Sequence, residues 1–205
     1  MKNGGAIYVF AGAIGAIVLL SSFRAKTTAT NMNKNMPDTR KPAGVTFAVF
    51  NQNPLNIKAS KDASGNIINQ YPGEITVKGA MHRMFDGWAY GTAAAFIHMW
   101  RYMNGLVTGD VYPKGMRLNT IEKIISTWAP KTDLRNDTEG YIRYIVQKTG
   151  IARNDELYFD ELDMRVLIKA MAPREDGKAA IYVTDEVLKD AWAIAKTYLS
   201  DKYKV

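Results

Sequence analysis

A run of twenty positions without a charge opens the chain, at residues 4–23 (GGAIYVFAGAIGAIVLLSSF). A helix of that length rises about 30 Å, which matches the hydrocarbon core of a bilayer. Lys2 lies before the run, and Arg24 and Lys26 follow it. The pattern predicts a transmembrane anchor at residues 1–23. A cleaved signal peptide is the alternative, because it shares the basic start and the apolar centre.

Small residues recur four positions apart within this run, as Ala11 with Gly15 and Gly12 with Ala16. That spacing lets two membrane helices approach closely, so we expect self-association through these four residues. Both flanks of the run are basic, and the orientation across the membrane therefore stays open. The expected partner at this end of the chain is a lipid bilayer.

Residues 24–46 are rich in Thr, Asn, Lys and Met and show no apolar period, which predicts a flexible tether. A folded domain is expected at residues 47–205. Near its start, residues 45–50 (VTFAVF) suit a short strand or a buried extended stretch. Two β-like runs, at 67–68 and 75–77, flank a Tyr-Pro-Gly turn and predict a small hairpin.

Helical spacing of apolar positions dominates the chain after residue 86. Asn119 and Glu122 have the spacing of a capping box, and Pro173 is expected to end the helix before it. The fold class is therefore mainly α, with an N-terminal transmembrane helix and a minor β-hairpin. Spacing and end signals together predict five helices, at 87–104, 119–128, 137–149, 160–172 and 184–199.

The net charge of +7 is concentrated beside the apolar run. Residues 1–46 hold six basic side chains and one acidic side chain, whereas residues 47–205 hold twenty-one basic and nineteen acidic ones. A nearly neutral domain with a basic flank suits phosphate headgroups at a membrane better than nucleic acid. We therefore expect no nucleic-acid partner.

Three stretches carry a family resemblance: residues 51–58 (NQNPLNIK), 119–130 (NTIEKIISTWAP) and 136–142 (NDTEGYI). Residues 85–94 (FDGWAYGTAA) match the helix that follows the first motif. In order and spacing they resemble a family of phage virion-associated, lysozyme-like proteins over residues 47–195. The twelve-residue motif that ends in Trp-Ala-Pro is the most specific.

The resemblance implies a lysozyme-like, α-rich domain that cuts the glycan strands of peptidoglycan, or descends from proteins that cut them. A membrane-anchored member is similar to virion proteins of phages with an internal membrane. The implied location is the virion membrane, with the bacterial inner membrane as the alternative.

Cleavage of a glycosidic bond needs a carboxylic acid in a partly apolar groove, because desolvation raises its pKa. The family often ends its penultimate helix with His-Glu-Asn-Gly, and residues 174–177 (REDG) stand at the matching place. Glu175 is therefore the leading catalytic candidate. Arg174 and Lys178 beside it are expected to lower its pKa, and a solvated loop charge is the competing interpretation.

Glu74 is the second catalytic candidate, because it lies beside the predicted hairpin turn and such a hairpin commonly walls a lysozyme-like groove. An exposed turn residue is its alternative interpretation. Asn53 and Asn56 are candidates for binding sugar hydroxyl or acetamido groups. Amides in such a loop more often satisfy backbone groups, and that alternative stays open.

The absence of cysteine excludes disulfide scaffolds, zinc fingers and thiolate catalysis. His82 and His98 have no carboxylate at a spacing that forms a metal site, and His98 lies among apolar residues like a core histidine. No phosphate-binding or nucleotide motif appears, so we expect neither a metal nor a cofactor.

Two functions follow. The first is a membrane-anchored muramidase or lytic transglycosylase of the virion that assists genome delivery or lysis. The second is a catalytically inactive structural protein that links the membrane to the capsid or a vertex. The implied partners are peptidoglycan for the first function and capsid or vertex proteins for the second.

Overall fold

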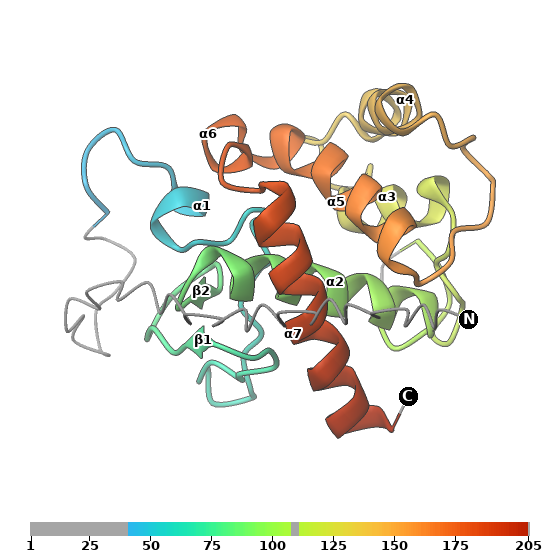
Figure 1. Ribbon diagram of the computed structural model, residues 1–205. Coiled ribbons are helices and arrows are strands. Elements are labelled where there is room, and N and C mark those ends of the chain that lie inside the picture. The colour runs from blue at the N-terminus through green and yellow to red at the C-terminus, as the bar shows by residue number, and fades with distance from the viewer. Residues whose placement is uncertain (1–40, 108–110, 205) are drawn as a thin grey trace, which may run out of the picture. The chain divides into compact units, whose positions relative to one another are not determined.

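Helix α2 (Trp88–Met103) is the element around which the other helices pack, as the computed structural model shows (Figure 1). The structure describes residues 41–107 and 111–204. Every residue of α2 from Gly91 to Met103 is buried except His98. A helix that is apolar on nearly all sides must be covered on nearly all sides. The long C-terminal helix α7 (Asp185–Tyr203) covers one of them by crossing α2.

The remaining elements follow in chain order around this centre (Figure 1). The main core contains apolar residues from all the longer helices. Their bounds are α1 (Phe47–Phe50), β1 (Glu74–Ile75), β2 (Met84–Phe85), α3 (Ile121–Trp128), α4 (Thr138–Thr149), α5 (Glu161–Glu175) and α6 (Gly177–Ala180).

Side-chain caps explain where the longer helices begin. The side chains of Thr120, Asp137 and Thr184 each accept a hydrogen bond from a backbone N–H in the first turn of α3, α4 and α7. Such a bond satisfies a donor that has no partner inside the helix. The predicted capping box is wrong in detail, because Thr120 caps α3 and Glu122 instead forms an ion pair with Arg153.

The first two predictions that differ from the structure concern short elements. Residues 47–50 form the helical turn α1 rather than a strand, because the Thr46 hydroxyl accepts a hydrogen bond from the backbone N–H of Val49 at 3.3 Å. The hairpin pairs Glu74 with Phe85 and Ile75 with Met84, rather than residues 75–77 with 67–68. Ile67 forms an isolated bridge with Lys61 instead.

Pro173 does not end α5, which continues to Glu175. Proline removes one hydrogen bond of the helical ladder, and in the last turn that loss affects a single carbonyl. The backbone N–H of Asp176 donates to the carbonyl of Ala172 at 2.9 Å and closes the helix end. The candidate acid Glu175 therefore sits on a helix rather than in a loop after it.

The predicted fold class needs a larger correction. Within residues 41–107 and 111–204, no helix is both long and apolar enough to cross a membrane. The structure is thus mainly helical with a two-stranded hairpin, and the transmembrane helix is not retained in the fold class. The sequence that predicted the anchor, the self-association motif of Ala11, Gly12, Gly15 and Ala16, and the tether up to residue 40 lie outside the described residues.

A buried ion pair organises the segment between α1 and α2. The carboxylate of Glu74 pairs with the guanidinium of Arg83, and both side chains are 1 % exposed. Glu74 Oε2 also accepts the backbone N–H groups of Gln70 and Tyr71 at 2.8 and 3.3 Å. Arg83 in turn donates to the Ser60 hydroxyl at 2.8 Å. These bonds join the two strands to the loop before them.

We predict that Glu74→Gln destabilises the domain by about 3–5 kcal/mol, because it leaves the buried Arg83 cation without a counter-charge. Urea unfolding followed by circular dichroism measures the change. Glu161→Gln is the matched control, since Glu161 pairs with Arg165 on the helix surface and its loss should cost less than about 1 kcal/mol. Equal losses in the two variants would contradict the structural role of the buried pair.

Candidate functional site

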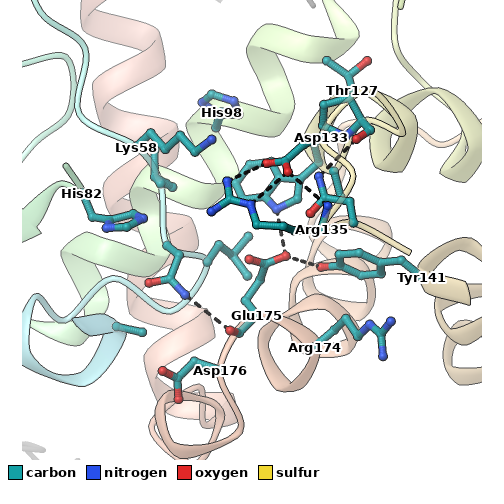
Figure 2. A pocket seen from close by; sticks show the side chains of 18 of the residues that line it. Lys58, His82, His98, Thr127, Asp133, Arg135, Tyr141, Arg174, Glu175 and Asp176 are labelled. Atoms are coloured by element: carbon teal, nitrogen blue, oxygen red, sulfur yellow. Dashed lines mark hydrogen bonds and ion pairs between the residues drawn. The ribbon is translucent and has the colours of Figure 1, made fainter. Parts of the chain in front are cut away.

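A groove of about 1360 Å³ runs between the end of α5 and the end of α3 (Figure 2). Residues 55–60 form one side, and the segment from Thr127 to Asp137 forms the other. Helix α2 contributes His98 and Tyr102 to the lining. Glu175 lies in the middle of the view in Figure 2, where the sticks from both sides converge.

Two neutral donors hold the carboxyl group of Glu175. The indole Nε1 of Trp128 donates to Glu175 Oε1 at 2.9 Å, and the hydroxyl of Tyr141 donates to the same oxygen at 2.7 Å. Trp128 is the last residue of α3 and Tyr141 lies in the first turns of α4. The carboxyl group is therefore fixed by three helices at once.

Burial raises the pKa of Glu175 above its ordinary value. Removing a carboxylate from water disfavours its charged form, and this effect outweighs the hydrogen bonds from Tyr141 and Trp128 and the charge of Arg174, which all act to lower the pKa. The predicted direction was therefore wrong. The two cations that were expected to lower this pKa have other partners. Arg174 Nη2 lies 3.7 Å from Asp137 Oδ2, with its guanidinium over the ring of Tyr141, and Lys178 Nζ donates to the carbonyl of Gly44.

The motifs that carry the family resemblance meet at this carboxyl group. Trp128 comes from the Trp-Ala-Pro motif, and Tyr141 comes from the motif at residues 136–142. The two motifs also bind each other, since the Thr138 hydroxyl donates to the carbonyl of Ala129 at 2.6 Å. The Asn136 amide likewise donates to the carbonyl of Pro130 at 3.2 Å. The loop between α3 and α4 is thus closed at its base.

The first motif contributes two asparagines with different positions. Asn53 is fully buried, and its amide group donates to the carbonyls of Ile57 and Arg83 and accepts the N–H of Ile57, each at 3.0 Å. Its side chain therefore shapes the loop and has no surface for a sugar. Asn56 lines the groove, and its amide donates to the backbone oxygen of Glu175 at 3.4 Å.

Glu74, the second catalytic candidate, does not lie in the groove with Glu175. Its carboxylate is enclosed by Arg83 and the backbone of residues 70–71 and is 1 % exposed. It is therefore neither an exposed turn residue nor a second acid facing the groove. Of the two predicted glutamates, Glu175 therefore lies in the groove, and Glu74 is buried in the ion pair with Arg83.

His98 is a groove residue whose position the sequence does not indicate. It is the one partly exposed residue within 91–103 of α2, and its Nδ1 shares a hydrogen bond of 2.7 Å with the Tyr71 hydroxyl. Burial, together with the charges of Arg101 and Arg83, lowers the pKa of His98 to about 3. The imidazole is therefore neutral at physiological pH, and its ring packs edge-on against Trp128 with centroids 5.4 Å apart.

Three aspartates also line the groove, and each has a local structural partner. Both carboxylate oxygens of Asp133 bind Arg135, which lowers the pKa of Asp133 to about 2. Asp137 caps α4 and Asp176 caps α6. Glu175 is the groove carboxyl group whose pKa is raised. No group of three His, Cys, Asp or Glu residues in the described segments could hold a metal ion.

Comparison with known proteins supports a phage origin for this arrangement. The chain is 33 % identical to "Protein P5" of Pseudoalteromonas phage PM2 over 139 residues, which cover 68 % of this chain and 76 % of that protein. No family model matches the chain. The lysozyme-like part of the resemblance therefore stays a prediction.

We predict that Tyr141→Phe raises the pKa of Glu175 further, because it removes a donor that favours the charged carboxylate. The lost hydrogen bond should also lower the free energy of unfolding by about 1 kcal/mol. Titration of the Glu175 carboxyl carbon by NMR measures the pKa. Tyr158→Phe, at an exposed tyrosine, should leave it unchanged. An unchanged or lowered pKa in Tyr141→Phe would contradict the assigned contact.

We also predict a pH-dependent effect of Glu175→Gln on stability. Since the pKa of Glu175 is raised by folding, the folded state binds this proton more tightly than the unfolded chain. The resulting stability is present at acid pH and is lost as pH rises through the folded pKa. Glutamine keeps an acceptor for Trp128 and Tyr141 and has no proton to lose.

The unfolding free energy of Glu175→Gln relative to wild type should therefore increase between about pH 4 and about pH 7.5. Urea unfolding at both pH values measures this difference. Glu156→Gln, at an exposed loop glutamate, should show no such trend. A difference that does not change with pH in Glu175→Gln would show that burial does not control this carboxyl group.

Proposed function

Because this chain belongs to the family of Protein P5 of Pseudoalteromonas phage PM2, we propose that it is a virion-associated phage protein whose helical domain cleaves the glycan strands of bacterial peptidoglycan. Glu175 is the proposed acid of the reaction. The observation that carries the proposal is that Glu175 lies in a groove and that burial raises the pKa of its carboxyl group. A general acid near its operating pH needs this environment.

The proposed reaction begins with proton transfer from the Glu175 carboxyl group to the glycosidic oxygen. The bond between that oxygen and the anomeric carbon then breaks, and positive charge develops on the sugar ring. Trp128 and Tyr141 hold the other carboxyl oxygen, so their role is to fix the direction of the acid. They also stabilise the carboxylate that remains after the proton has left.

The second half of the reaction separates two enzyme classes. A hydrolase generally uses a second carboxylate to activate water or to attack the sugar. Asp133, Asp137 and Asp176 are each engaged by Arg135 or by a helix N-terminus. We therefore favour a lytic transglycosylase reaction, in which the C6 hydroxyl of the same sugar attacks its anomeric carbon and returns the proton to Glu175.

Asn56 is the proposed substrate-binding residue of the first motif. It lies in the lining of the groove, and its amide nitrogen is held by the backbone oxygen of Glu175. The amide oxygen of the same side chain is the group that would accept a hydrogen bond from a sugar hydroxyl. Asn53 is not included, because all of its surface is buried.

A structural role in the virion is the second candidate function. The favouring observation is that Oε1 of Glu175 already accepts two hydrogen bonds from different helices. A carboxyl group bound in this way stabilises the packing of α3, α4 and α5 even without catalysis. In that case the domain would serve as a linking protein with capsid or vertex proteins as its partners.

A zymogram with the full-length chain in a peptidoglycan-containing gel tests the proposal. We expect a cleared band for the wild-type chain and a loss of activity of at least about 100-fold for Glu175→Gln. Glu156→Gln should keep wild-type activity. Mass spectrometry of the released products should show anhydro ends rather than reducing ends.

No clearing by a folded wild-type sample would favour the structural role. Clearing that Glu175→Gln leaves undiminished would remove the assignment of the acid. Circular dichroism of each sample provides the control for folding.

A further inference from the structure

A second hollow of about 610 Å³ adjoins the Glu175 groove. The two share Ser60, His98 and Val107 in their linings, so they lie side by side, and together they are called the depression here. The second hollow extends from His98 to the C-terminal end of α7, where Lys202 and Tyr203 line it. The depression is thus longer than the reaction at Glu175 requires, which suits an extended polymer.

Among residues 41–107 and 111–204, those that line the second hollow include basic side chains and no carboxylate. Arg101 and Lys202 are the two cations, and the remaining lining residues are neutral. The groove around Glu175 has a mixed lining, in which Glu175 and three aspartates stand beside Lys58, Arg135 and Arg174. The described lining of the second hollow carries cations alone, so this end favours an anionic group.

Arg101 is held firmly in this hollow. Its guanidinium donates to the side-chain and backbone oxygens of Gln70 at 3.1 and 3.0 Å and stacks over the ring of Tyr71 at 4.6 Å. These bonds use two of its five N–H donors. The backbone oxygen of Gln70 also accepts the Tyr198 hydroxyl at 2.7 Å, which ties α7 to the same point.

Lys202 supplies the second positive charge, at the rim of the hollow. It lies in the last turn of α7, is exposed, and donates to the Tyr198 hydroxyl at 2.9 Å. An ammonium group has three donors, so it keeps the capacity to bind an anion. A preorganised guanidinium beside a flexible ammonium group is an arrangement that binds carboxylates.

We propose that this hollow is a subsite for the peptide stems of peptidoglycan, which binds their carboxylates through Arg101 and Lys202. The inference rests on the proposed function of the Glu175 groove. A glycan strand bears peptide stems with free carboxylates at regular intervals along its length. A strand bound across Glu175 places a stem in the neighbouring basic hollow, so the domain recognises peptide-bearing strands in preference to bare ones.

The test uses the full-length chain with Glu175→Gln, so that strands are not cut during the measurement. The probes are end-labelled glycan strands with peptide stems, strands stripped of stems by an amidase, and strands whose stem carboxylates have been converted to amides. Fluorescence anisotropy gives the three affinities. Amidase treatment leaves a lactyl carboxylate on the sugar, so the probes differ in their stem carboxylates alone. We expect the strands that keep their stem carboxylates to bind about tenfold more tightly than either of the other two.

The variant is Lys202→Glu, because replacing Arg101 would also release Gln70 and Tyr71 and disturb the fold. Lys202→Glu should weaken binding of the carboxylate-bearing strands about fivefold and leave the stripped strands unaffected. Lys196→Glu is the matched control, since Lys196 is exposed on α7 and lies outside both linings.

Equal affinities for the three strands, or equal effects of Lys202→Glu and Lys196→Glu, would overturn the subsite. Failure of the proposed function is separate, because it is measured as absent cleavage by the wild-type chain. A strand preference that persists without cleavage would support the subsite and contradict the enzyme.

Discussion

The burial of α2 is the constraint on which the rest of the structure depends. Twelve of the thirteen positions from Gly91 to Met103 are buried, all except His98, so each neighbouring segment is placed where it must cover apolar surface. Helix α7 covers one side along its length, and α5 and the hairpin cover others. His98 marks the gap in this cover. The groove reaches the central helix there, where His98 and Tyr102 belong to its lining.

The two glutamates show how surroundings decide what a carboxyl group does. Glu74 is enclosed with a guanidinium and two backbone N–H groups, so its charge is compensated and it serves the packing of a loop. Glu175 is enclosed with an indole and a phenol, which carry no charge. Burial then dominates and raises its pKa. The surroundings of Glu175 therefore suit a proton donor, whereas those of Glu74 suit a structural ion pair.

Local sequence patterns predicted the long helices well, since apolar spacing and capping residues act within a few positions. They failed where a residue far away in the sequence determines the local structure. Residues 74–75 pair with 84–85 because Glu74 meets Arg83, which no local propensity indicates.

Pro173 and Glu175 are further cases. The sequence predicts a helix end at Pro173, but the last turn of a helix accommodates a proline and α5 continues past it. The family resemblance points to Glu175, but its raised pKa comes from burial in the folded domain, which no local sequence pattern shows. The basic hollow joins residues from the 60s to the 200s and has no sequence signature.

The long sequence separations at Glu175 have a consequence for the order in which the molecule acquires its properties. The carboxyl group of Glu175 meets Trp128 and Tyr141 across 47 and 34 positions, and its backbone carbonyl meets Asn56 across 119 positions. Contacts between residues so far apart in sequence form slowly, because the entropy cost of closing a long loop comes before the contact can stabilise the fold. A nascent chain that ends before α5 already contains 22 of the 25 residues that line the groove, but not Glu175. The surroundings of the Glu175 carboxyl group therefore form only after α5 has been made and has packed against α3 and α4.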